Sequence, residues 1–483
     1  MELRGFEPLT FCMPCRRATS CAIAPCGSLH GQARDVNVDS LPVPGACVVP
    51  TYGRAGQGGP SRASPGEPEA IRGGHGRNAG TSELAQSPDL GPPAPGRVAT
   101  LAGVTTPATD PHLATPTGKP RARALGIPFQ GTPGPWNSIT DVTGVEVGYT
   151  TLIEGDSVRT GVTAIHPRGR GNPRDPVAAG FHSQNGNGEM TGVSWIEESG
   201  TFAGPIAITN THAVGIAHAG IIAWANQQDP VELWLLPVAA ETWDGYLNDV
   251  NGHHVTEEHV VQALQGARGG PVDEGSVGGG TGMTCYAFKG GSGTSSRMVD
   301  YQGTAYTVGV FVQANFGARG ELTIAGVPLG AELADDNPVA DYFSPPGRPP
   351  AAPPGAGSVI AVVATDAPLL PGQCKALARR VTLGLARTGT AGSHSSGDLF
   401  IACSTANSGA FAPGEPYGQL SFVPWGKTDR FFTAVVQATE EAVIDAMVAN
   451  EEMTGRAGHR VPALPRDRVA RLITTNSGTS PSR

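Results

Sequence analysis

Short apolar segments recur along the chain from about residue 124 onward, and each is bounded by glycine, proline or polar turn residues. Apolar runs of this length predict strands, whereas longer segments with apolar positions three and four residues apart predict helices. In the first half, small and apolar residues over 213–227 predict a buried helix, and Thr256 is expected to begin another. The strands predicted there are 138–150, 160–166, 206–212, 234–238 and 307–313, and the polar, glycine-rich segment 180–192 is expected to be a loop.

The second half repeats the alternation of strand and helix. An abrupt change from proline-rich to apolar sequence starts a buried strand at Ser358, and a helix over 368–387 follows it. A second strand over 398–404 precedes a helix over 429–450. Because strands alternate with helices on both sides of Ser358, the sequence predicts one layered α/β domain.

The first 119 residues lack this pattern. They are rich in arginine, glycine, proline and serine, and they cannot bury enough apolar surface to offset chain entropy. We therefore expect 1–119 to be disordered, or to be a wrongly translated extension with the true start near Arg121, and 120–483 to form the single domain. No basic region followed by an apolar segment of about 7–15 residues opens the chain, so a cytoplasmic location is expected.

Composition and charge narrow the classes of partner. Among the 483 residues only 16% are charged, and the formal net charge is -9. This acidic balance argues against a nucleic-acid-binding protein, which would show a basic stripe. No apolar run approaches the roughly 20 residues that span a bilayer. The sequence therefore predicts neither a nucleic-acid nor a membrane partner.

Cysteine and glycine spacing argue against a metal or cofactor. Five of the eight cysteines lie before residue 50, which leaves three for the main domain. Because an odd number of cysteines cannot all pair within one domain, we expect a reduced compartment for it. The Cys12-x-x-Cys15 pair has no second pair at a zinc-site spacing. The glycine run 275–283 is not closed by Gly-Lys-Ser/Thr as a phosphate-binding loop would be. We expect no metal site and no cofactor.

The proline-rich segment 345–357 (PPGRPPAAPPGAG) is expected to be extended, and it places Ser358 directly behind Gly357. If the Gly357–Ser358 bond were cut, Ser358 would carry both a hydroxyl and an α-amine, whose ordinary pKa of about 7.7–8.0 suits a general base. The same hydroxyl can attack the unhindered carbonyl of Gly357. The pattern alone also suits an ordinary serine at the start of a strand, so both interpretations stay open.

Other polar residues at strand ends supply the groups that such a nucleophile needs. A loop rich in hydroxyls at a strand entrance holds Ser396 and Asp398, although it does not match the GxSxG nucleophile elbow. Asn315 ends an apolar strand, where its amide can donate to an oxyanion. Glu241 and Tyr246 follow the strand predicted at 234–238. Each residue also suits a turn, a cap or a solvated position.

Seven longer motifs connect these residues. They are NGNGEMTG (185–192), ITNTHAVG (208–215), ETWDGYLND (241–249), VGGGTGM (277–283), VQANFG (312–317), GSVIAVVATDAPLLP (357–371) and SSGDLF (395–400). Through these motifs and their order, residues 124–474 resemble the DmpA-type peptidase family, the L-aminopeptidase/D-esterase and β-peptidyl aminopeptidase group. The resemblance does not include 1–119.

The resemblance implies a four-layer α/β/β/α sandwich similar to N-terminal nucleophile hydrolases, and a precursor cut between Gly357 and Ser358 into an α chain and a β chain (358–483). It implies a tetramer of such αβ units acting on a small peptide or amide. By motif position the nucleophile is Ser358. The further site residues that it implies are Ser396 and Asp398 as polar partners, Asn315 as oxyanion donor, Tyr246 as a catalytic residue and Glu241 as the group that binds the substrate ammonium.

Two other functions remain compatible with the sequence. Ornithine acetyltransferases share this fold but use a threonine nucleophile and a different junction sequence, so Ser358 favours hydrolysis. A non-catalytic, glycine-rich binding protein is the alternative from another class. A chain of 49.4 kDa that never cleaves would favour it.

Overall fold

The computed structural model describes residues 110–228, 234–344, 347, 355–412 and 416–477. Most of 1–119 and most of the proline-rich segment therefore lie outside the described residues. The part from 110 to 119, however, is ordered: Thr117 hydrogen-bonds Asp273, and the Lys119 ammonium donates to the Glu274 carbonyl at 3.0 Å. The folded part thus begins about ten residues earlier than expected, because polar contacts anchor a segment that has little apolar surface.

Two mixed sheets form the centre of the fold. The smaller has the order β1-β2-β5-β6, and the larger has the order β4-β3-β14-β13-β10-β9. Their strands are β1 (Glu146–Glu154), β2 (Val158–His166), β3 (Val177–Gly186), β4 (Thr201–Phe202), β5 (Ile206–Asn210), β6 (Val238–Thr242), β9 (Gly291–Tyr301), β10 (Thr304–Asn315), β13 (Ser358–Thr365) and β14 (Gly397–Ser404). Short two-residue strands pair as β7 with β8 (Thr284–Cys285, Phe288–Lys289), β11 with β12 (Thr323–Ile324, Val327–Pro328) and β15 with β16 (Met453–Thr454, Arg460–Val461).

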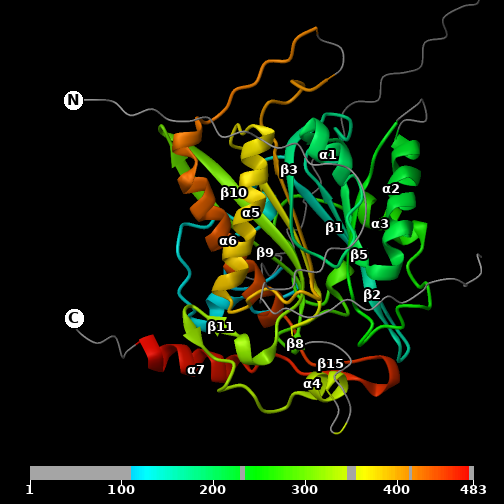
Figure 1. Ribbon diagram of the computed structural model, residues 1–483, viewed down its shortest axis with the longest axis vertical. Coiled ribbons are helices and arrows are strands. Elements are labelled where there is room, and N and C mark those ends of the chain that lie inside the picture. Colours follow the sequence, from blue (N-terminus) through cyan, green and yellow to red (C-terminus); the bar gives the residue numbers. More distant parts are fainter. Residues whose placement is uncertain (1–109, 229–233, 345–346, 348–354, 413–415, 478–483) are drawn as a thin grey trace, which may run out of the picture. The chain divides into compact units, whose positions relative to one another are not determined.

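Helices cover the outer face of each sheet. α2 and α3 pack on the smaller sheet, and α5 and α6 pack on the larger one (Figure 1). The helices are α1 (Val193–Ser199), α2 (Val214–Gln228), α3 (Glu257–Gln265), α4 (Pro338–Phe343), α5 (Pro371–Arg387), α6 (Asp429–Val448) and α7 (Arg466–Ser477). This arrangement confirms the expected four-layer α/β/β/α sandwich. Within the described residues, no helix combines the length and apolarity needed to cross a lipid bilayer.

Strand β13 shows why the sequence folds into layers. Its eight residues are all buried, and successive side chains point to opposite faces. Val359 and its odd-numbered neighbours pack against the layer of α5 and α6, whereas Ile360 and its even-numbered neighbours pack between the two sheets. A continuous apolar run is therefore required here, because both faces of the strand are covered.

Two local predictions need correction. The strand expected at 234–238 lies at Val238–Thr242, so Glu241 is inside β6 and not beyond its end. Pro237 cannot donate a ladder hydrogen bond, and Trp234 is 74% exposed, so the bulky apolar residues before Val238 do not form the strand. The polar, glycine-rich segment 180–192 was expected to be a loop, but its first part extends β3 to Gly186.

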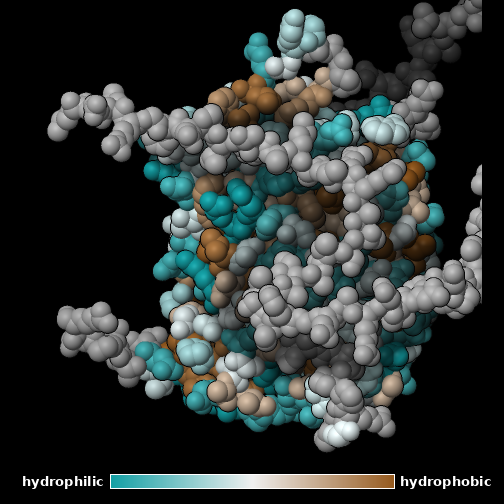
Figure 2. All heavy atoms as spheres, in the orientation of Figure 1, coloured by the Kyte–Doolittle hydropathy of each residue, from teal (hydrophilic) through white to brown (hydrophobic). Residues whose placement is uncertain are grey.

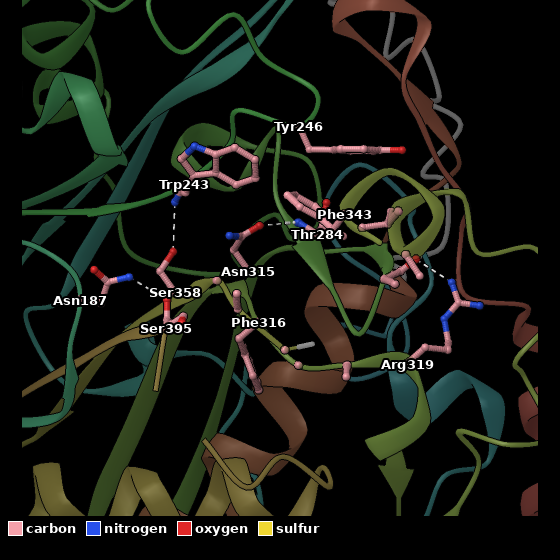
Figure 3. A pocket seen from close by; sticks show the side chains of 18 of the residues that line it. Asn187, Trp243, Tyr246, Thr284, Asn315, Phe316, Arg319, Phe343, Ser358 and Ser395 are labelled. Carbon is pink, nitrogen blue, oxygen red and sulfur yellow. Dashed lines mark hydrogen bonds between the residues drawn. The ribbon is translucent and has the colours of Figure 1, made fainter. Parts of the chain in front are cut away.

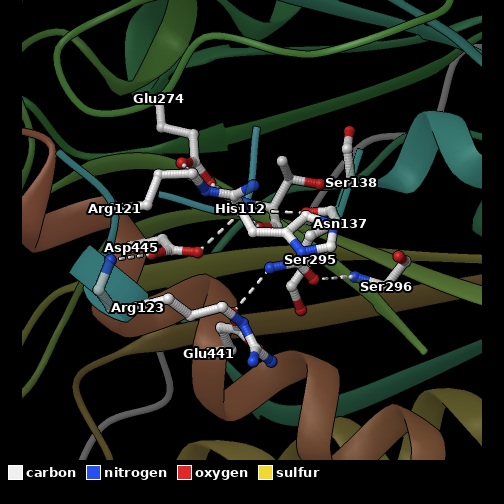
Figure 4. Close-up of polar contacts among 12 residues, drawn as sticks. His112, Arg121, Arg123, Asn137, Ser138, Glu274, Ser295, Ser296, Glu441 and Asp445 are labelled. Atoms are coloured by element: carbon white, nitrogen blue, oxygen red, sulfur yellow. Dashed lines mark hydrogen bonds and ion pairs between the residues drawn. The ribbon is translucent and has the colours of Figure 1, made fainter. Parts of the chain in front are cut away.

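A buried ionic network fixes the start of the domain to its last long helix (Figure 4). The Arg121 guanidinium lies 2.8 Å from the Glu274 carboxylate and 2.9 Å from that of Asp445, and the side chains of all three are at most 4% exposed. Glu441, also on α6, pairs with Arg123 at 2.5 Å and with Arg297 at 2.6 Å. Removing one member of such a set would leave an uncompensated buried charge.

The visible surface is largely hydrophilic. On the face seen in Figure 2, hydrophilic residues cover much of the area outside the grey atoms, and hydrophobic residues form small, separate groups. Trp195 and Trp234 form an exposed aromatic pair, and their rings meet edge to face with 6.2 Å between the centroids.

Candidate active site

Ser358 begins β13 and faces the space between the two sheets. Only 2% of the residue is exposed, and its even-numbered position places it on the same face as Ile360. Its hydroxyl oxygen accepts a hydrogen bond of 3.0 Å from the backbone N–H of Trp243 (Figure 3). β6 ends at Thr242, so this N–H lies just beyond the strand and meets the hydroxyl from the other sheet.

Glu241 lies two residues before Trp243 and lines the same cavity. One carboxylate oxygen accepts from the Glu189 N–H at 2.9 Å, and the other accepts from the Thr211 hydroxyl. Burial raises the pKa of this carboxyl above its ordinary value, although both hydrogen bonds oppose that shift. The site therefore holds a desolvated carboxylate that a cationic ligand would stabilise.

Asn315 ends β10 and stands opposite Ser358 in the antiparallel ladder. Its side-chain oxygen accepts from the Thr284 N–H at 2.8 Å, and only the oxygen of an amide can accept. The NH2 group is thereby fixed on the other side, toward Ser358 (Figure 3). An amide donor beside a hydroxyl is the arrangement that stabilises a tetrahedral oxyanion.

The Gly357–Ser358 peptide is held at the end of the β13–β14 ladder. The Gly357 carbonyl accepts from the Gly397 N–H at 3.0 Å. A Cβ atom at Gly357 would lie 2.0 Å from the Asn315 carbonyl oxygen, which is far inside van der Waals contact. Glycine is therefore required here by the close approach of β10, as well as by access to the carbonyl.

Ser396 and Asp398 form a hydrogen-bonded pair on either side of Gly397, which is the ladder neighbour of Ser358. The Ser396 hydroxyl donates to Asp398 at 2.5 Å, and the Asn185 amide donates to the second carboxylate oxygen at 2.9 Å. Burial raises the pKa of Asp398, and the two hydrogen bonds counteract this. The pair is thus oriented at the strand end that carries Ser358.

Tyr246 is placed differently from the other predicted site residues. Its ring lines the cavity and stacks on His459 with 4.7 Å between centroids, but its hydroxyl donates to the Arg460 carbonyl at 3.3 Å. Figure 3 shows that hydroxyl pointing away from Ser358. The structure therefore brings Ser358, Asn315 and Glu241 together, and places Tyr246 in the wall.

One cavity of about 440 Å³ connects these groups. Several of its contributors were not identified from the sequence as site residues, among them Trp243, Thr284 and Arg319. The first two act through backbone N–H groups, which have no side-chain signature. Asn185 and Asn187 were also missed, although both lie in the quoted NGNGEMTG motif; the Asn187 amide donates to the Ser395 carbonyl at 2.7 Å. No group of three or more metal-binding side chains occurs among the described residues.

Comparison with known proteins identifies relatives of the chain. The profile of peptidase family S58 matches residues 137–461. The beta-peptidyl aminopeptidase BapA of Sphingosinicella microcystinivorans is 48% identical over 369 residues, which is 73% of this chain and 92% of that protein.

Solved structures agree with this assignment. One is the L-aminopeptidase D-Ala-esterase/amidase of Ochrobactrum anthropi, which is described as a variant of the Ntn-hydrolase fold. It superposes with a TM-score of 0.69 at 45% sequence identity, and the match covers 75% of this chain and 100% of that one. A beta-aminopeptidase from a Burkholderia species superposes with a TM-score of 0.66 at 42% identity, covering 74% and 98%. The serine-centred cavity therefore lies in a peptidase of the Ntn-hydrolase fold, and the chain belongs to peptidase family S58, the DmpA-type family.

Proposed function

We propose that the protein is a self-cleaving aminopeptidase that removes N-terminal residues from short peptides, amides or esters through the N-terminal Ser358 of its β chain. The acyl residues considered are L-, D- or β-amino acids. One observation carries the proposal: the hydroxyl of Ser358, the amide of Asn315 and the carboxylate of Glu241 share one cavity. They supply a nucleophile, an oxyanion donor and a site for an ammonium group, without a cofactor.

Self-cleavage would use the peptide that the ladder already holds. The Ser358 hydroxyl attacks the Gly357 carbonyl carbon, while the Gly397 N–H stabilises the carbonyl oxygen, to which it is already bonded at 3.0 Å. The C–N bond breaks and the nitrogen takes a proton, so that an ester joins Gly357 to the serine oxygen. Water hydrolyses this ester and leaves a carboxylate on Gly357 and a free α-amine on Ser358.

Substrate hydrolysis would then use that amine as the general base. It accepts the hydroxyl proton as the Ser358 oxygen attacks the first carbonyl of a substrate, and it returns the proton to the leaving amine. The NH2 group of Asn315 donates to the oxyanion, and water resolves the acyl-enzyme. Ser396 orients the amine, and the Ser396 hydroxyl in turn donates to the Asp398 carboxylate in a hydrogen bond of 2.5 Å. Tyr246 serves as a wall of the site in this scheme.

Replacing Glu241 by glutamine is expected to raise KM for substrates with a free amine and to lower kcat/KM about 30-fold or more, because a buried charge loses its partner. In the wild-type protein, KM should rise as pH falls through the raised pKa of Glu241, since the protonated carboxyl no longer attracts an ammonium. Steady-state kinetics on an amino-acid amide and on its N-acetyl derivative measures both effects.

Glu189→Gln is the matched control, since Glu189 is exposed and hydrogen-bonds Glu241 through its backbone N–H. Because the charge of Glu189 helps to raise the pKa of Glu241, this variant should only shift the rise in KM to lower pH. Equal kinetics for Glu241→Gln and wild type, or efficient hydrolysis of the N-acetyl substrate, would contradict an aminopeptidase.

Asn315→Ala is expected to lower kcat by about 10²–10³ with a small change in KM, as loss of one oxyanion donor does elsewhere. Self-cleavage should persist in this variant, because the donor assigned to that reaction is the Gly397 backbone. Mass spectrometry and kinetics on one preparation separate the two reactions. A variant that is fully active, or that fails only to cleave itself, would remove Asn315 from its assigned role.

We further propose that the processed αβ units assemble into a homo-oligomer, a tetramer as in the family expectation, in the cytoplasm. The exposed and contacting side chains of Trp195 and Trp234 support a surface for subunit contact, because large apolar groups are costly to leave in water. Sedimentation of the processed protein tests the assembly, and a monomer at micromolar concentration would exclude it.

A further inference from the structure

Arg319 lies past the end of β10, at the side of the cavity remote from Ser358 (Figure 3). The residue is only 5% exposed. Its guanidinium donates to the carbonyls of Tyr286 at 2.9 Å and Ala287 at 2.6 Å, and to two carbonyls of the 333–335 loop at 2.9 and 3.2 Å. These bonds fix the group in place and use four of its five N–H groups, and the remaining Nη2–H has no acceptor among the described residues.

The acceptors around Arg319 are neutral carbonyls, and its guanidinium lies over the Phe288 ring at 3.4 Å from the centroid, so among the described residues no carboxylate contacts the positive charge. The nearest acids are Asp335 and Asp336, and each pairs with another arginine, Arg468 or Arg460. Both aspartates are more than half exposed, so water screens them. Burial lowers the pKa of Arg319 to about 10, which still leaves it charged at neutral pH.

The two charges of the cavity lie on opposite sides of the nucleophile. Glu241 lies beside the 187–189 segment, because a Cβ atom on Gly188 would be 3.2 Å from its carboxylate oxygen. Figure 3 shows Asn187 on one side of Ser358 and Arg319 on the other side, beyond Asn315. A carboxylate, a hydroxyl and a guanidinium therefore follow one another along the cavity.

We propose that Arg319 binds the C-terminal carboxylate of the leaving group, so that the preferred substrates are short zwitterionic peptides with both termini free. This inference rests on the proposed aminopeptidase function and names the substrate class of that site. Glu241 holds the ammonium, the scissile carbonyl lies at Ser358, and the far carboxylate neutralises the buried guanidinium by a charge-assisted hydrogen bond. A volume of about 440 Å³ suits a ligand of this size.

The wild-type protein supplies the first test. Dipeptides beginning with L-alanine, D-alanine or β-alanine are assayed in pairs, as the free acid and as the C-terminal amide. For whichever acyl residue is accepted, kcat/KM is expected to be about tenfold or more higher for the acid, mainly through KM. Equal values for acid and amide would overturn the proposal without a variant having to fold.

Variants then assign the preference to one residue. Arg319→Gln should reduce the acid-to-amide ratio to about one, and Arg319→Lys should retain part of it. The matched control is Arg168→Gln. Arg168 is another largely buried arginine, it donates to backbone carbonyls at distances of 2.5–3.2 Å, and it does not line the cavity. The control should keep the wild-type ratio whatever its activity.

The outcomes distinguish a wrong substrate class from a wrong aminopeptidase assignment. If Arg319→Gln lowers acid and amide hydrolysis by the same factor, Arg319 only stabilises its loops and the proposed substrate class is wrong. If the wild-type protein cleaves amides with no acid preference, the substrate class fails while the aminopeptidase stands. If no substrate with a free amine is hydrolysed at all, both fail together.

Discussion

Replacing Ser358 by alanine is expected to leave one uncut chain of 49.4 kDa and to lower hydrolysis of amino-acid amides by roughly 10⁴-fold or more. The single substitution removes the attacking oxygen of self-cleavage and the nucleophile of substrate hydrolysis. It also leaves the α-nitrogen in a peptide bond, where it cannot act as a base. The methyl group fits the buried position, so the fold should be retained.

Denaturing mass spectrometry of both proteins, followed by amide hydrolysis, measures these effects. The wild-type protein should give a fragment that begins at Ser358. Ser395→Ala is the matched control, because Ser395 also lines the cavity but contacts Asn187 through its carbonyl, and it should cleave normally. An intact wild-type chain that is nonetheless active would eliminate the N-terminal nucleophile, and an intact inactive one would favour a binding protein.

Arg121→Met is expected to lower the free energy of unfolding by about 3–5 kcal/mol, the usual cost of breaking a buried ion pair from one side. Glu274 and Asp445 would stay buried without their cation. Burial already raises the pKa of Asp445 to about 6 and that of Glu274 well above its ordinary value. Arg121 opposes both shifts, so its loss raises these pKa values further.

The sign of the pH dependence follows from that shift. A carboxyl whose pKa is raised in the folded state favours folding when it is protonated, and this contribution is lost as pH rises. The deficit of Arg121→Met should therefore be larger at pH 8 than at pH 5. Urea unfolding at both pH values measures it. Arg170→Met, which breaks an exposed pair with Glu146, should cost less than about 1 kcal/mol; equal deficits in the two variants would refute the network's role.

The sequence predicted those parts of the site that depend on local pattern. The apolar run after Gly357 identified β13 and placed Ser358 at its start, and the strand before Asn315 was equally clear. Both follow from strand periodicity, which is a local property. The motifs predicted Glu241 and Asp398 as site residues through resemblance, although the first lies inside its strand and not beyond it.

The remaining parts depend on contacts between distant segments. The N–H of Trp243 reaches Ser358 only because the end of β6 and the start of β13 lie at the same edge of facing sheets, and no residue type encodes a backbone donor. The ordered segment 110–119 has an unfavourable composition, but Asp273 and Glu274 compensate for it from about 155 residues away. Tyr246 lines the cavity, and the contact of its hydroxyl with the Arg460 carbonyl joins segments more than 200 residues apart, so no local pattern shows it; its catalytic role stays a prediction.

The position of β13 and β14 inside the larger sheet affects the protein after the proposed cut. Both strands belong to the β chain, whereas their outer neighbours β3 and β10 belong to the α chain, and the two chains are hydrogen-bonded along both borders. Separating them would expose a largely apolar core, so the cut chains should stay associated. Once unfolded, however, they must find each other in solution. Refolding then becomes a second-order reaction that slows on dilution. The lifetime of the mature enzyme therefore depends on its rate of unfolding more than on its equilibrium free energy of unfolding.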